Sequence, residues 1–148
     1  MNKIRDAVYM AGGYVYNCHY HLIWVTKYRK PIFTTDAKRQ AIKDLLMKLA
    51  QLNEIQIDTI EVMPDYIHLL VTFPPRLSIT NVIKALKGGS ARLWFKQWPA
   101  TKQLLWGGHL WSRSYYVGTV GNMSKAVVDN YIHQQRSSKA SSGRKPQK

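Results

Sequence analysis

Residues 55–73, IQIDTIEVMPDYIHLLVTF, contain two apolar runs separated by the turn signal Pro64-Asp65. The first run alternates between apolar and polar residues, and the second is rich in β-branched and aromatic residues, so both are predicted strands. Strands joined by so short a turn pair antiparallel. A β-hairpin therefore stands at the centre of the predicted fold.

Further elements are predicted on both sides of this hairpin. They are a strand over 14–26, a helix from the N-cap candidates Thr34, Thr35 and Asp36 to about Asn53, a helix from Ser78 to Trp98, a strand near 115–120 and a helix starting at Ser124. The order β-α-β-β-α-β-α is the split βαβ pattern with one added helix. We therefore predict an α+β fold: a ferredoxin-like split βαβ sandwich with its helices on one face of an antiparallel sheet.

Gly88-Gly89 falls inside the second predicted helix. Each glycine costs about 1 kcal/mol relative to alanine in a helix. The pair therefore predicts either a break or a close approach of backbone to a neighbour.

Length and composition indicate one domain in a soluble protein. The 148 residues suit a single core, which we place at 14–136, with a flexible N-terminus at 1–13 and a basic disordered tail at 137–148. No run of eighteen apolar residues indicates a membrane span, and no secretory signal is evident. The single cysteine, Cys18, fits a reducing compartment. The expected location is the cytoplasm.

Charge is distributed unevenly along the chain. Residues 1–65 hold 9 Lys+Arg and 7 Asp+Glu, whereas residues 66–148 hold 13 Lys+Arg and one acid, Asp129. Such a region favours polyanions, because each cation docked on a phosphate releases a counterion. Nucleic acid is the favoured partner, and an anionic membrane surface is the weaker alternative.

Two polar pairs suggest a catalytic site. Tyr66 and His68 lie two apart in a predicted strand and share a face, and Tyr131 and Gln135 lie four apart on one helix face. Taken alone, a strand histidine or a helix tyrosine more often serves packing than chemistry. Together they could form a phosphoryl-transfer site, with imidazole and amide oxygen binding a metal and the phenol acting as nucleophile.

Beyond these pairs, the chain resembles the IS200/IS605-type tyrosine transposases of the HUH endonuclease superfamily from about Tyr14 to Gln135. The matching segments are Tyr20-His21-Leu22-Ile23-Trp24, Lys27-Tyr28-Arg29, Glu61-Val62-Met63-Pro64-Asp65, His68-Leu69-Leu70, Lys84-Ala85-Leu86-Lys87-Gly88, Ser90-Ala91-Arg92, Leu105-Trp106-Gly107-Gly108, Leu110-Trp111, Ser114-Tyr115, Thr119-Val120 and Tyr131-Ile132. Their number and order make the resemblance far more specific than one motif.

The resemblance implies a transposase that moves an insertion sequence as single-stranded DNA. Tyr131 would attack the DNA to give a 5′-phosphotyrosine and a free 3′-OH, assisted by Mg or Mn. His68 matches the second histidine of the family's His-hydrophobic-His motif, and Gln135 matches the third ligand. The family acts as a homodimer on DNA whose ends carry hairpins.

Tyr66 departs from this pattern, since it occupies the position of the first motif histidine. A phenol with a pKa near 10 is a poor metal ligand at neutral pH. The sequence leaves three alternatives: a degenerate copy, a variant in which Tyr66 or a neighbour such as His21 substitutes, or an introduced change. Weaker metal binding and slower cleavage are expected.

The candidate DNA contacts lie in two segments and one loop. Two cations and an aromatic ring follow the first predicted strand: Lys27, Tyr28 and Arg29. Three cations lie in the second predicted helix: Lys84, Lys87 and Arg92. Tyr28 and the Trp106–Trp111 loop could stack on bases. The alternative to a transposase is a catalytically inactive relative that binds hairpin or single-stranded nucleic acid through these groups.

Overall fold

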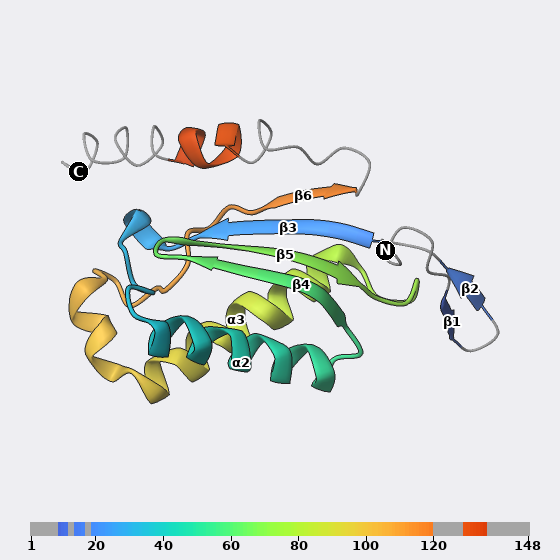
Figure 1. The fold of residues 1–148 in the computed structure, drawn as a ribbon, viewed down its shortest axis with the longest axis horizontal. Coiled ribbons are helices and arrows are strands. Elements are labelled where there is room, and N and C mark those ends of the chain that lie inside the picture. Colours follow the sequence, from blue (N-terminus) through green and yellow to red (C-terminus); the bar gives the residue numbers. More distant parts are fainter. Residues whose placement is uncertain (1–8, 12–13, 17–18, 120–128, 136–148) are drawn as a thin grey trace.

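The computed structural model describes residues 9–11, 14–16, 19–119 and 129–135 (Figure 1). Its main sheet has four strands in the order β4-β5-β3-β6, and each neighbouring pair is antiparallel. The strands are β3 (His19–Val25), β4 (Gln56–Met63), β5 (Tyr66–Thr72) and β6 (Tyr116–Thr119). Helix α2 (Asp36–Leu52) connects β3 to β4, and α3 (Ile79–Gln97) connects β5 to β6. The predicted ferredoxin-like α+β fold is confirmed.

Both long helices begin where a side chain caps their first free N–H groups. Thr35 Oγ1 accepts a hydrogen bond of 3.2 Å from the backbone N of Lys38, and Ser78 Oγ accepts one of 3.0 Å from Asn81. Helix α3 ends at Gln97 with Trp98 as its C-cap, because Pro99 cannot continue it and instead starts the 3-10 helix η2 (Pro99–Leu104). The cap proposed at Ser124 lies outside the described residues.

The two glycines of α3 have different surroundings within an unbroken helix. A Cβ on Gly89 would lie 2.8 Å from a methyl carbon of Leu49, whereas one on Gly88 would meet nothing within 4 Å. Of the two alternatives, the close approach is confirmed for Gly89. This glycine lets α3 pack against α2.

The N-terminal strand differs from the prediction. The expected strand over 14–26 is divided: β2 (Tyr14–Tyr16) pairs with β1 (Tyr9–Ala11), and only β3 joins the main sheet. The segment expected to be flexible, 1–13, therefore contains a strand at Tyr9–Ala11. The rest of that segment and the proposed tail at 137–148 lie outside the described residues.

A bulge in β4 decides which of its side chains share a face. The register with β5 shifts between Ile57 and Thr59, so Ile57 pairs with Val71 while Glu61 pairs with His68. Ile57 therefore packs against the core, on the face opposite Glu61, although the two residues lie four apart and would share a face in a regular strand. Beyond the bulge, Glu61 lies beside His68 on the face opposite the core.

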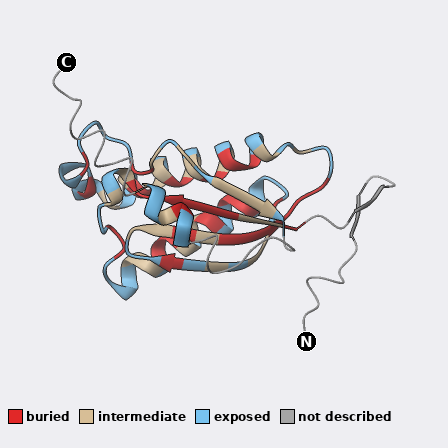
Figure 2. Cartoon of the chain, turned by 90° about the horizontal axis from the view of Figure 1, so that it is seen from above, coloured by how far each residue is buried: buried red, intermediate tan, exposed pale blue. Residues whose placement is uncertain are grey.

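The two faces of the sheet have different coverings. One face packs against α2 and α3 around fully buried side chains that include Leu22, Trp24, Ile67 and Leu69. The other face is covered in part by the helical residues 129–135, which Figure 1 shows on the side away from α2 and α3. Figure 2 shows the buried residues along the sheet and on the helix faces turned toward it. Within the described residues, none of the helices has the length and apolar character of a membrane span.

Candidate active site

The candidate site lies where the helical residues 129–135 cover β3 and β5. Strand pairing places Ile23 opposite His68 and Val25 opposite Tyr66. Tyr131 packs against Ile23 and Val25, and Tyr66 packs against the same cluster. The fold thus brings Tyr131 onto the sheet face that carries both Tyr66 and His68.

A hydrogen-bonded chain holds the helix side chains in place. Ser114 Oγ donates to Gln135 Oε1 over 2.8 Å, and it lies 3.0 Å from the Tyr131 hydroxyl. Because the serine hydrogen is used on Gln135, the phenol donates to Ser114. Burial raises the pKa of Tyr131, while the bond to Ser114 lowers it by less. At neutral pH the phenol is therefore protonated and fixed in position.

Lys87 in turn holds the segment that carries Ser114. Its Nζ donates to the backbone carbonyls of Ser112 at 2.7 Å, Ser114 at 3.2 Å and Arg113 at 3.4 Å. Burial lowers the pKa of Lys87 to about 8. Lys87 was predicted to contact DNA. In the structure its ammonium group instead donates to three backbone carbonyls of the protein. Its contacts link α3 to Ser114.

A second chain of hydrogen bonds surrounds His68. Its Nδ1 lies 3.0 Å from Glu61 Oε1, and its Nε2 lies 2.8 Å from Nδ1 of His21. In the neutral imidazole the exposed Glu61 accepts the Nδ1 proton, and Nε2 then keeps its lone pair. The pKa of His21 is lowered, mainly by burial and then by the charge of His68.

Tyr66 has the surroundings of a packing residue. It is half-buried and contacts the apolar cluster beneath Tyr131. Its pKa is raised by burial first and then by the carboxylates of Glu61, Asp65 and Asp129, against which Arg29 acts. A phenol whose proton is held this firmly is a poor metal ligand.

The predicted metal ligands therefore fall into two hydrogen-bonded groups. His68 belongs with His21 and Glu61, whereas Gln135 belongs with Ser114 and Tyr131. Among the described residues, no three His, Cys, Asp or Glu side chains are grouped to hold a metal ion. Any metal here would need imidazole donors together with oxygens from an amide, water or substrate.

The predicted DNA contacts have different surroundings. Arg29 Nε donates to Asp65 at 2.9 Å, and its Nη1 donates to the backbone carbonyl of Ile132 at 3.2 Å. Arg29 thus joins the β4–β5 turn to the helical residues 129–135, which carry Tyr131. Lys84 and Arg92 are exposed on α3, across the sheet from that helix. Lys27 lies over the ring of Tyr28, with 5.3 Å from Nζ to the centroid.

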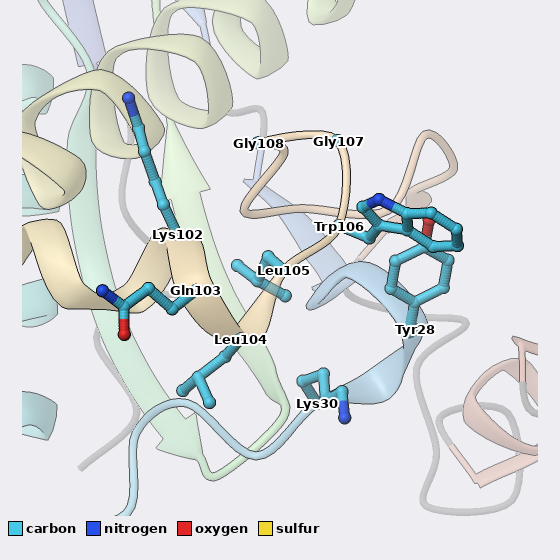
Figure 3. A pocket seen from close by; sticks show the side chains of 9 residues that line it. All are labelled: Tyr28, Lys30, Lys102, Gln103, Leu104, Leu105, Trp106, Gly107 and Gly108. Atoms are coloured by element: carbon cyan, nitrogen blue, oxygen red, sulfur yellow. The ribbon is translucent and has the colours of Figure 1, made fainter.

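An aromatic hollow lies beside this last pair. Trp106 is 85% exposed and Tyr28 is 36% exposed, and both line a surface hollow of about 640 Å³ with Lys30 and Lys102. Figure 3 shows both rings among the side chains that line the hollow, Tyr28 from the segment after β3 and Trp106 from the loop after η2. Trp111, by contrast, is buried and donates to Ser90 Oγ at 3.0 Å. Of the two tryptophans in the predicted stacking loop Trp106–Trp111, Trp106 is the one whose ring is exposed and could stack on a base.

Sequence reasoning missed the roles of Ser114, Glu61 and Lys87. Glu61 could have been found by counting outward from the Pro64-Asp65 turn, because Met63 then opposes Tyr66 and Glu61 opposes His68. No sequence pattern of this kind pointed to Ser114. Its contact with Tyr131 depends on how β6 and the last helix meet in space.

The fold and this site define a class of protein: an α+β protein of the kind seen in solved transposase structures. A Deinococcus radiodurans protein described as a transposase superposes with a TM-score of 0.80 at 44% identity, over 86% of this chain and 97% of that one. A REP-associated tyrosine transposase bound to a REP hairpin shares the fold, with a TM-score of 0.51 at 13% identity, over 85% of this chain and 67% of that one.

Sequence comparison then gives the family. The profile described as "Transposase IS200 like" matches residues 14–135, so the chain belongs to the IS200-like transposase family. It is 43% identical over 123 residues to the ISDra2 transposase TnpA of Deinococcus radiodurans, spanning 83% of this chain and 87% of that protein. It is 34% identical over 119 residues to the IS200 transposase of Salmonella typhimurium, spanning 80% of this chain and 78% of that one.

Proposed function

We propose that this transposase cleaves and rejoins single-stranded DNA at the ends of an insertion sequence through Tyr131. The observation that carries the proposal is the set of hydrogen bonds that joins Tyr131, Ser114 and Gln135. It lies on the sheet face that carries His68. A tyrosine that served packing alone would not need its hydroxyl positioned by a serine that is itself fixed by Lys87. Hairpin DNA is the proposed ligand, and a homodimer is the proposed active unit.

The proposed reaction exchanges one phosphodiester bond of the DNA for a bond between phosphorus and Tyr131. The phenol oxygen of Tyr131 attacks phosphorus and the bond from phosphorus to the 3′ oxygen breaks, which gives a 5′-phosphotyrosine and a free 3′-OH. The phenol proton passes toward Ser114 and then to solvent, and the leaving 3′ oxygen gains a proton from solvent. Attack by a 3′-OH on the phosphotyrosine reverses the step and rejoins DNA.

A divalent metal, Mg or Mn, is proposed to assist this reaction. His68 Nε2 and Gln135 Oε1 are the donors that could hold it, because neutral imidazole and amide oxygen both bind such ions. When bound, the ion would polarise the phosphate and offset the charge that develops on it. The raised pKa of Tyr66 argues against a third bond from that phenol.

A second candidate function is nucleic-acid binding without cleavage. Tyr66 favours it, since a phenol packed in an apolar cluster stands where the family has a histidine. The aromatic hollow and the exposed cations of α3 would serve such a protein equally well.

The experiment that separates the two functions measures covalent DNA on the protein. The chain is mixed with labelled single-stranded DNA from the ends of its own element, with Mn²⁺ or Mg²⁺, and analysed on a denaturing gel. A transposase gives an adduct that is absent in Tyr131→Phe and after chelation. An adduct only in Tyr66→His would show that the unaltered chain has lost its metal site. DNA binding with no adduct in either chain would leave the binding function.

A further inference from the structure

The sheet register places His21 beside the predicted ligand His68. Ile23 is opposite His68 and His21 is opposite Leu70, so the two histidines are diagonal neighbours on one face. Their ring centroids are 5.1 Å apart, and His21 Nδ1 lies 2.8 Å from His68 Nε2. Two nitrogens thus converge on the face that also bears Tyr66.

We propose that His21 supplies the second imidazole of a divalent transition-metal site at Nε2 of His68, in the role that Tyr66 cannot fill. The inference rests on the proposed function, because it concerns the metal of that same site. The 2.8 Å between the two nitrogens is the length of a hydrogen bond along which they face each other. An ion at about 2.0–2.1 Å from both, a usual metal–imidazole distance, therefore requires both rings to turn so that their lone pairs point at it.

The protons can be placed consistently with metal binding. His68 donates Nδ1–H to Glu61, so its Nε2 carries a lone pair and accepts the Nδ1 proton of His21. When His21 shifts that proton to its own Nε2, its Nδ1 also gains a lone pair, and the turn of both rings directs the two lone pairs to one ion. No oxidation or reduction is involved.

Glu61 completes the arrangement expected around a ligating histidine. Metal-binding histidines generally donate their other ring N–H to a carboxylate, which fixes the ring and strengthens the ligand nitrogen. The contact of 3.0 Å between His68 Nδ1 and Glu61 Oε1 has this form. Glu61 is thus a positioning residue that acts through His68.

The donor set also determines which ions are favoured. Two imidazoles suit Mn²⁺, Co²⁺, Ni²⁺ or Zn²⁺ better than Mg²⁺, which prefers oxygen ligands. The remaining positions are open to the amide oxygen of Gln135, to water and to a phosphate oxygen of bound DNA. The site therefore takes a first-row transition metal and prefers it to magnesium.

The test measures Mn²⁺ binding to the full, DNA-free chain by titration calorimetry. We expect His21→Gln to weaken binding at least 10-fold and Glu61→Gln to weaken it by about 10-fold. Tyr66→Phe should leave the affinity unchanged, and His109→Gln, which alters an exposed histidine outside the site, controls for background binding. Unchanged affinity in His21→Gln, or an equal loss in Tyr66→Phe, overturns the proposal.

A second readout does not depend on how a variant folds. Pulsed electron paramagnetic resonance of Mn²⁺ on the unaltered chain should detect two coordinated imidazole nitrogens, and one nitrogen would overturn the proposal. Failure here is distinct from failure of the proposed function. Tyr131→Phe should bind Mn²⁺ as the unaltered chain does and form no DNA adduct. If the unaltered chain forms the adduct but its His21→Gln variant binds Mn²⁺ with full affinity, only the inference about His21 is refuted.

Discussion

At the scale of single residues, the proposed reaction depends on the loss of the proton of Tyr131. The pKa of this phenol is raised, chiefly by burial, so the reactive phenolate is scarce at neutral pH. Because the fraction of phenolate grows about tenfold per pH unit below the pKa, adduct formation should accelerate from pH 6 to 8, the range in which Lys87 keeps at least half of its charge. Initial rates at saturating DNA and Mn²⁺ would show this. A rate that falls or stays flat over this range contradicts the assigned nucleophile.

Ser114 provides the second prediction at this scale. Ser114→Ala removes the acceptor for the phenol and should slow adduct formation about 10-fold, since a lost hydrogen bond of this kind costs about 1.4 kcal/mol. Ser114→Thr keeps a hydroxyl and should restore most of the rate. DNA affinity, measured separately, should stay the same in both. Equal rates in the alanine and threonine variants would remove Ser114 from the mechanism.

At the scale of elements, the packing of α3 on α2 can be tested with its two glycines. Gly88→Ala adds a methyl group in open space and should stabilise the fold by up to about 1 kcal/mol through helix propensity. Gly89→Ala places its methyl group against the buried Leu49 and should destabilise by about 1 kcal/mol. Urea unfolding of the pair measures the difference. Equal stabilities would contradict the close approach of the two helices.

The elements also show how much the sequence could predict. Strand alternation and the caps at Thr35 and Ser78 were enough for the element order and the ferredoxin-like fold. The bulge at Asp58 was missed, although the apolar positions change phase there, from Ile55 and Ile57 to Ile60 and Val62. Tyr131 and His68 could be selected by face and spacing. Ser114 could not, because its role depends on a contact between elements far apart in the chain.

At the scale of the whole molecule, charge and aromatic rings should affect DNA binding differently. Trp106→Ala removes a stacking surface and should weaken binding to single-stranded DNA roughly 5- to 150-fold with little change in salt dependence. Changing both Lys84 and Arg92 to Ala should instead reduce the salt slope by about 2. Leu52→Ala, an exposed apolar residue at the end of α2, is the matched control. Affinity measured across several salt concentrations separates these effects, and an unaffected Trp106→Ala variant would exclude the aromatic hollow from DNA binding.

The central claim is that Tyr131 carries the DNA during the reaction. The most direct test treats the reacted protein with nuclease and protease and locates the nucleotide remnant by mass spectrometry. We predict a phosphonucleotide on the peptide that contains Tyr131, both in the unaltered chain and in Tyr66→His. A remnant on Tyr66 or on any other residue, with Tyr131 unmodified, would contradict the account.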